Sequence, residues 1–234
     1  MEVDIDVKFV FALCVPGTGE LTPRGERTRA ALVTAARKIF ERDGFLGARI
    51  TDIAEAANVA HGTFYTYFGD KESIFGAVIE SLQDDFLAPD RSPRVDGETP
   101  YDQILRANRR YYDTYVKRAK LMGLLEHVAT FNDDFRALRR EVRHRIVARS
   151  ERAIRRWQDA GFADSTIDAH YAANALGSMV DRSVYVWLVL GEPHDPDVAI
   201  EMLTRLWANA LGLATPPPAA RHRAPGAPRA RARR

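Results

Sequence analysis

The amino-acid sequence predicts an all-α protein made of a small N-terminal and a larger C-terminal helical part. Between Thr28 and Leu213, apolar residues recur at spacings of three and four, the period of an amphipathic helix. Almost no segment alternates with the period of two that a half-buried strand requires. Prolines within this stretch stand only at expected joints between helices: Pro89, Pro93, Pro100, Pro193 and Pro196.

Length and composition allow one large domain or two smaller ones. The chain has 234 residues, of which 46% are hydrophobic and 28% charged, so it can build a sizeable core. Its single cysteine, Cys14, cannot form an intramolecular disulfide, which favours a reducing compartment, and we expect a cytoplasmic protein. No apolar run approaches the roughly 18 residues of a membrane-spanning helix.

The two chain ends differ from the rest. In residues 1–22, Val7 to Val15 has the length of a signal-peptide core, but acidic residues precede it where basic ones are required, so we expect an extension of uncertain order. Residues 215–234 hold six arginines, no acids and five prolines, which predicts a disordered tail. This tail either attracts nucleic-acid phosphates or merely adds solubility, and both interpretations stay open.

Local signals delimit four helices in the N-terminal part. Gly44 suits a helix end, and Thr51 and Asp70 are expected as N-caps because their side-chain oxygens can accept the free N–H groups of a first turn. Asn58 can take the left-handed backbone that a tight turn requires. The expected helices cover residues 26–43, 52–57, 61–68 and 71–86.

Two short helices joined by a three-residue turn and braced by longer helices form the helix-turn-helix pattern. Phe64 and Phe68 stand four apart and can be buried together, which turns the rest of the third helix outward. That outward face has no Lys or Glu and consists of hydrogen-bonding side chains and a glycine: His61, Gly62, Thr63, Tyr65, Thr66 and Tyr67.

This outward face predicts a DNA-binding surface. A helix in the major groove reads bases from its N-terminal end, so His61, Gly62 and Thr63 are placed for base contacts and Tyr65, Thr66 and Tyr67 for phosphates. Further candidates for contacts to the DNA backbone are Thr51 and Lys71, at the starts of helices. Arg24 and Arg27, on the approach to the first helix, could lie along the DNA backbone or reach a groove. Plain packing stays an alternative, because residues 21–76 carry eight basic and seven acidic side chains, a net charge of only +1.

Residues 26–82 closely resemble the N-terminal domain of TetR-type transcriptional regulators. From Thr51 to Glu72 the chain follows the family pattern T-x-x-I-A-x-x-A-x-V-x-x-G-T-x-Y-x-Y-F-x-x-K-E. The resemblance implies phosphate contacts by Tyr65, Tyr67 and Lys71 and base readout around residues 61–63. Ala60 departs from the family pattern, which usually has a capping Ser, and losing such a cap costs about 1 kcal/mol.

Beyond a Pro- and Gly-rich break at residues 88–100, the remainder predicts a helical effector-binding and dimerisation domain. Asn132, Asp164 or Ser165, and Asp195 are expected to cap helices, and Gly161 and Gly191 to end them. The expected helices cover residues 101–117, 119–130, 133–160, 165–190 and 195–212. The expected divisions of the chain are therefore 1–22, 23–76, 77–214 and 215–234.

The last two expected helices carry apolar residues on more than one stripe, so each requires two packing partners. One face can pack on its own domain and the other on a second subunit, as in a two-fold four-helix interface. The resemblance to TetR-type proteins also implies a homodimer, which would recognise a palindromic double-stranded operator. Complete burial within a monomer is the alternative.

An effector pocket is expected among the helices over residues 101–117, 119–130, 133–160 and 165–190. It would take a small apolar or amphipathic molecule that releases a repressor from its operator. The candidate residues are aromatic or flexible, although such a stripe is also typical of a plain core: Tyr112, Tyr115, Leu121, Met122, Leu125, His127, Phe131, Met179 and Trp187. Nine arginines between residues 136 and 156 predict a solvated face, or contacts to an anionic effector through Arg139, Arg143 and Arg149.

No motif predicts catalysis or a cofactor. The sequence lacks a nucleophile elbow, a phosphate-binding glycine loop and an HExxH pair. Its histidines never stand three or four apart, so helical metal pairing is not expected. We therefore expect a regulator and no enzyme; the alternative is a soluble helical enzyme or a ligand-binding module with a vestigial helix-turn-helix.

Overall fold

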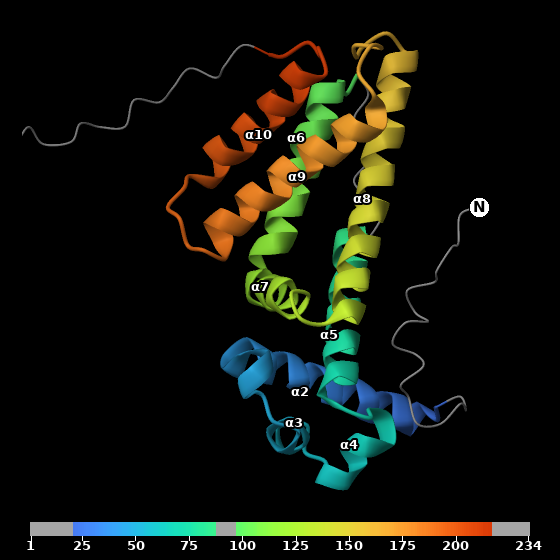
Figure 1. The fold of residues 1–234 in the computed structure, drawn as a ribbon, viewed down its shortest axis with the longest axis vertical. Coiled ribbons are helices and arrows are strands. Elements are labelled where there is room, and N and C mark those ends of the chain that lie inside the picture. The colour runs from blue at the N-terminus through green and yellow to red at the C-terminus, as the bar shows by residue number, and fades with distance from the viewer. Residues whose placement is uncertain (1–20, 88–96, 217–234) are drawn as a thin grey trace, which may run out of the picture.

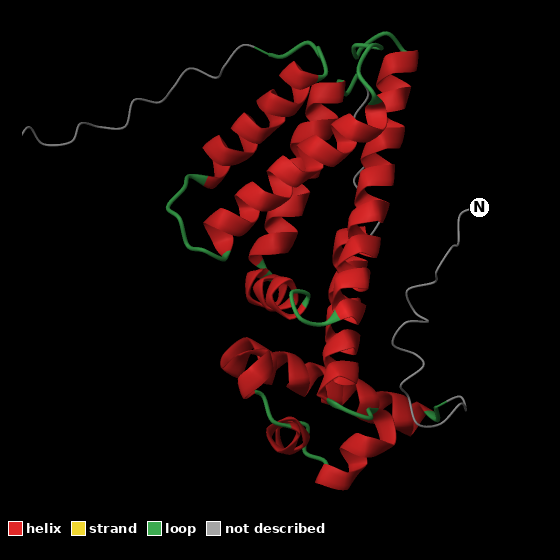
Figure 2. Cartoon of the chain, viewed as in Figure 1, coloured by secondary structure: helices red, strands yellow, loops and turns green. Residues whose placement is uncertain are grey.

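The computed structural model describes residues 21–87 and 97–216, and their regular secondary structure is entirely α-helical (Figure 2). The expectations for the N-terminal extension, the break after residue 87 and most of the Arg-rich tail lie outside these residues. None of the described helices is both long enough and apolar enough to span a bilayer.

The N-terminal part forms the lower end of the molecule in Figure 1. Thr22 caps its first helix, with the Gly25 N–H donating to Thr22 Oγ1 over 3.2 Å. Gly44 interrupts that helix with a φ of 72°, as expected of a helix stop, and one further helical turn follows it. The helices are α2 (Pro23–Gly47), α3 (Ile50–Ala56), α4 (His61–Tyr67) and α5 (Lys71–Leu87).

The C-terminal part is an elongated bundle above it, with α8 running along one side (Figure 1). Asn132 caps α8 and Asp195 caps α10, each through its side-chain oxygen, as predicted. Thr99 and Asp102 form a reciprocal capping box at the start of α6. The helices are α6 (Pro100–Val116), α7 (Ala119–Val128), α8 (Asp133–Asp159), α9 (Ala169–Leu188) and α10 (Pro196–Ala210).

Two predicted caps are wrong. Thr51 is the second residue of α3 and not its cap, because the helix begins one residue before it, at Ile50. The helix α9 is capped by Asp168, whereas Asp164 accepts hydrogen bonds from the backbone and hydroxyl of Thr166 and closes a separate turn. Both Asp residues offer a good capping oxygen, so the local sequence does not decide which one starts the helix.

The buried residues form two apolar clusters. The first includes the core of α2–α5 but continues into α7, through Leu121 and Leu125, and into the first turns of α8, through Phe135 and Leu138. The second fills the space between α6, α8, α9 and α10. The core of the N-terminal part therefore extends beyond residue 76, where the sequence places the domain boundary, and α7 contributes to both clusters.

Candidate DNA-binding surface

The turn between α3 and α4 is held by the backbone. Asn58 adopts the predicted left-handed conformation, with a φ of 55°. The Val59 N–H donates to the Ala54 carbonyl over 3.0 Å, and the Val59 side chain packs against the first cluster. A tight turn of this kind fixes the direction in which α4 leaves α3.

The inner face of α4 is anchored by two phenylalanines. Phe64 has no exposed surface and Phe68 is 2% exposed, and their ring centroids lie 5.8 Å apart. The rings pack with residues of α2, α3 and α5 in the same cluster. The spacing of four in the sequence therefore predicted the buried face correctly.

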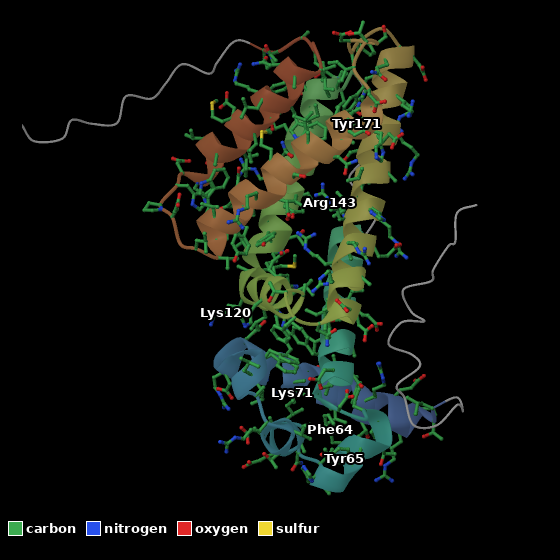
Figure 3. The ribbon with its side chains drawn as sticks, viewed as in Figure 1. Phe64, Tyr65, Lys71, Lys120, Arg143 and Tyr171 are labelled. Atoms are coloured by element: carbon green, nitrogen blue, oxygen red, sulfur yellow. The ribbon has the colours of Figure 1, made fainter. Side chains whose placement is uncertain are left out.

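The outer face of α4 is polar and accessible. His61, Gly62, Tyr65 and Thr66 are exposed, whereas Thr63 and Tyr67 are half-buried. Figure 3 shows Tyr65 at the lower edge of the molecule, beneath the buried Phe64. Tyr65 is 45% exposed, and its ring contacts that of His61 edge-on, with 5.4 Å between the ring centroids. This edge contact limits the conformations of the His61 and Tyr65 side chains.

Gly62 has no structural reason to be glycine within the described chain. Its backbone is helical, and a Cβ atom added there would meet no atom within 4 Å. Glycine in a helix costs roughly 0.5 to 1 kcal/mol relative to alanine. Glycine at position 62 therefore makes α4 less stable than alanine would, and no contact within the described residues requires it. The position lies in the middle of an otherwise polar surface.

Neither short helix has a side-chain cap. Ala60 precedes α4 and Arg49 precedes α3, and neither side chain accepts a hydrogen bond from the helix it precedes. Ala60 departs from the family pattern, in which a Ser usually caps this helix. As expected from that departure, the first N–H groups of α4 have no side-chain hydroxyl to accept their hydrogen bonds.

The first turns of α2 lie close to the end of α4. The Arg29 guanidinium stands over the Phe68 ring, 5.2 Å from its centroid. Arg24 and Arg27, within two turns of Arg29, are exposed. Arg49 is also exposed and next to α3, although the sequence reasoning did not select it; its position directly before the helix-turn-helix was the available signal.

Lys71 does not project freely from the surface. Its Nζ donates to the carbonyls of Leu46 and Ala48, over 3.4 and 3.3 Å, and lies 4.9 Å from the centroid of the Phe45 ring. These contacts attach the start of α5 to the loop between α2 and α3. A phosphate contact by this ammonium would compete with them.

Some of the basic charge in this part is neutralised locally. The Arg42 guanidinium bonds both carboxylate oxygens of Asp43 over 2.7 Å and lies 4.0 Å from Asp52. The hydrogen bond from Arg42 holds the pKa of the Asp43 carboxyl below its usual value. Attraction of phosphate therefore depends on the other exposed cations: Arg24, Arg27, Lys38 and Arg49.

The predicted effector residues separate into three groups. Leu121 and Leu125 belong to the first cluster, together with the core of α2–α5. His127 and Phe131 are exposed and contact each other edge-on at the junction of the two parts. The structure brings the remaining residues together in or against the second cluster: Tyr112, Tyr115, Met122, Met179 and Trp187.

A network of hydrogen bonds and ion pairs joins α6, α7, α8 and α9 beside the second cluster. Arg139 of α8 bonds Glu126 of α7 and, over 2.7 Å, Asp181 of α9, which also accepts from the Tyr111 hydroxyl of α6. Burial raises the pKa of Tyr111 well above its usual value, and the neighbouring Asp181 raises it further. Burial lowers the pKa of Arg139, but the two carboxylates outweigh it and keep this guanidinium charged.

The other arginines of α8 follow two patterns. Arg143 donates to Ser178 Oγ over 2.7 Å and reaches the Asn174 carbonyl, and thereby ties α8 to α9. Arg149 is exposed and makes no ion pair with the described residues. Within residues 21–87 and 97–216 no group of three or more His, Cys, Asp or Glu side chains could hold a metal ion.

Comparison with known proteins identifies the family. The model of the family described as bacterial regulatory proteins, tetR family, matches residues 32–78. TtgR, a transcriptional regulator of Pseudomonas putida, is 29% identical over 182 residues, which cover 73% of this chain and 84% of TtgR. NicS, a transcriptional repressor of P. putida, is 31% identical over 108 residues, 46% of this chain and about half (51%) of its own length.

Solved structures share the whole architecture. The fatty acid degradation regulator FadR of Bacillus halodurans aligns with a TM-score of 0.67 at 18% identity, covering 84% of this chain and all of FadR. SmeT, the repressor of the Stenotrophomonas maltophilia multidrug efflux pump SmeDEF, aligns with a TM-score of 0.64 at 20% identity, covering 79% and 92%. These identities establish a common fold. The matched N-terminal model and the related sequences identify the chain as a member of the TetR family of transcriptional regulators.

Proposed function

We propose that the protein is a repressor that binds a palindromic operator as a dimer through the outer face of α4 and leaves it when a small molecule binds. The observation that carries this proposal is the accessible face of hydrogen-bonding side chains around Gly62, whose missing side chain leaves room for close approach by a partner. Because the target is DNA, we expect the protein in the cytoplasm.

We assign base contacts to His61, Gly62 and Thr63 and phosphate contacts to Tyr65, Thr66 and Tyr67. Support comes from the order of these residues along α4, because the N-terminal end of a recognition helix lies deepest in the major groove. Thr51 and the exposed Arg24 and Arg27 flank this face and are assigned to the backbone, as is the amide end of α5 at Lys71.

An apolar stripe on α10 supports dimerisation through the last two helices. Val198, Met202 and Leu206 follow one another at intervals of four and are 56%, 44% and 52% exposed. Leu190, two residues after the end of α9, is 57% exposed. A stripe of this length has no partner among the described residues, and a two-fold axis beside it would bury it against its own copy.

The dimer proposal is tested by placing a charge in that stripe. Met202→Glu should shift the protein from dimer to monomer in sedimentation equilibrium, because an unpaired carboxylate would be buried in the interface. Glu201→Gln, at the preceding residue and on a different side of α10, is the control and should leave the dimer intact. A Met202→Glu variant that remains dimeric would place the interface elsewhere.

Coupling between the two parts is assigned to α7. A Cβ added at Gly123 would stand 2.9 Å from a methyl group of Val189, so α7 lies directly against the end of α9. On its other side the Leu124 side chain lies 3.9 Å from a Cβ built on Gly44 of α2. A shift of α7 would therefore displace α2 and the α4 it supports, and a coupling of about 1 to 3 kcal/mol would suffice for release.

The effector is assigned to small apolar or amphipathic molecules, because the predicted residues that meet at the second cluster are mostly aromatic or aliphatic. The names of two structural neighbours, one for fatty acid degradation and one for multidrug efflux, agree with this class.

A mobility-shift titration tests the function directly. We expect a specific complex with a palindromic site in the DNA upstream of the protein's own gene, and release on addition of an active extract. Tyr65→Phe should weaken binding to all sequences alike, whereas Thr63→Val should change the preferred sequence. Failure to form a specific complex with any palindromic probe would favour a ligand-binding module with a vestigial helix-turn-helix.

A further inference from the structure

Residues 191–195, in the loop between α9 and α10, contact the bundle through one side chain. Gly191, Glu192, Pro193 and Asp195 are exposed, and only His194 among residues 191–195 is half-buried. Gly191 has a φ of 80°, a conformation that favours glycine and turns the chain sharply out of α9. Figure 1 shows this loop bowed away from the bundle. The inward position of His194 is therefore not explained by burial of the loop itself.

His194 occupies a site made of an indole face and a hydroxyl. Its ring stacks on Trp187 of α9, with 5.1 Å between centroids and 16° between planes. Its Nε2 lies 2.6 Å from the Tyr112 hydroxyl of α6, and Nδ1 lies 3.2 Å from the Glu192 carbonyl. A carbonyl can only accept, so in the neutral imidazole Nδ1 carries the proton and Nε2 accepts from Tyr112. Burial raises the pKa of Tyr112, which keeps its hydroxyl protonated as a donor.

The contacts of His194 indicate which chemical group this site binds: a flat ring with an acceptor nitrogen in its plane. Stacking on Trp187 favours planar rings, and the Tyr112 hydroxyl favours one with a lone pair directed toward α6. Tyr112 and Trp187 were both predicted as effector residues from the sequence, whereas His194 was not.

We propose that His194 is an internal occupant of the effector site and that the effector is a planar nitrogen heteroaromatic that displaces it. That this displacement releases DNA rests on the proposed function. The site itself is inferred from the contacts among Tyr112, Trp187 and His194 alone. Displacement would release residues 191–195 from their side-chain contact with the bundle. The loop joins Leu190 to Val198, two exposed residues of the proposed dimer face. Replacement of His194 by the effector would therefore change the position of residues at the subunit interface.

Imidazole is the probe, with the full-length His194→Gly variant as its receptor at about pH 8, where free imidazole is mostly neutral. Calorimetry should give binding about tenfold tighter to His194→Gly than to the natural protein, a difference of roughly 1.4 kcal/mol. Pyrrole, the same ring without an acceptor nitrogen, should bind about fivefold more weakly than imidazole, as the loss of one hydrogen bond predicts. Adding Tyr112→Phe should remove this difference between the two ligands.

Equal binding of imidazole to both proteins, or equal binding of pyrrole and imidazole to His194→Gly, would overturn the proposal. If His194→Gly does not fold, proton NMR of the natural protein decides: the carbon-bound ring protons of His194 should move downfield in Trp187→Leu, and unchanged positions would contradict the stacking. Operator affinity of imidazole-bound His194→Gly separates the two proposals. Tight imidazole binding without weaker operator binding would support the site and contradict ligand-controlled release.

Discussion

The two parts of the molecule are held together by different kinds of contact. In the DNA-binding part, the rings of Phe40, Phe45 and Phe75 pack against one another with centroids 4.9 to 5.9 Å apart. In the effector part, helices are joined by polar bridges such as those of Arg139 to α7 and α9 and of Arg143 to α9. Close-packed rings have few alternative arrangements, whereas hydrogen-bonded groups can exchange partners with water or a ligand.

The apolar core of one part and the polar bridges of the other suit their proposed functions, DNA recognition and effector response. A recognition helix must keep a fixed position relative to its partner in the dimer, which a dense apolar core provides. An effector domain must have a second arrangement within a few kcal/mol of the first, and a polar network that is partly exposed to water makes one accessible. Substitutions in the two parts should therefore differ in their effect on the free energy of unfolding.

Phe64→Ala should have the largest effect. Removing a side chain with no exposed surface from the centre of the first cluster should cost about 3 to 5 kcal/mol of the free energy of unfolding. Chemical denaturation measures this loss. Tyr65→Phe, at the next position but on the exposed face, is the control and should change stability by less than about 0.5 kcal/mol. Similar losses in both variants would mean that α4 is not oriented as described.

Arg139→Met should cost less, about 2 kcal/mol. The change leaves Glu126 and Asp181 without their shared cation, but both carboxylates are partly exposed, so water compensates for part of the loss. Arg149→Met, which removes an exposed and unpaired arginine of the same helix, should be nearly neutral. If the two variants lose equal stability, the polar network does not hold the effector part together.

Ala60→Thr should raise stability slightly. A hydroxyl at this position can accept a free N–H of α4, which is worth about 0.5 to 1 kcal/mol. Ala60→Val has nearly the same shape without the oxygen and should bring no such gain. Thermal denaturation of the pair isolates the hydrogen bond, and equal melting temperatures would show that the first turn of α4 is satisfied in another way.

Sequence reasoning predicted the DNA-binding part more fully than the effector part. The spacing of Phe64 and Phe68, the left-handed Asn58 and the stop at Gly44 are local signals, and each determines the backbone within a few residues. The start of α9 was placed wrongly because Asp164 and Asp168 are equivalent as caps, and only the packing of the neighbouring helices decides between them.

The contacts between distant helices left no local signal. Nothing near Lys71 indicates that its ammonium bonds carbonyls 23 and 25 residues earlier. The effector residues were chosen by type, and type alone cannot show that Leu121 and Leu125 face α2–α5 while Tyr112 and Trp187 meet His194. Such placements depend on the crossing of helices, which residue spacing does not encode.

Gly62→Ala tests the assignment of the recognition surface most directly, because stability and DNA binding should change in opposite directions. Alanine fits at position 62 without any clash and should stabilise the protein by roughly 0.5 to 1 kcal/mol. The added methyl group on the face proposed to enter the groove should weaken binding to the operator by about tenfold, roughly 1.4 kcal/mol, in a fluorescence anisotropy titration at fixed salt. A stabilised variant with unchanged operator affinity would show that DNA binds to a different surface.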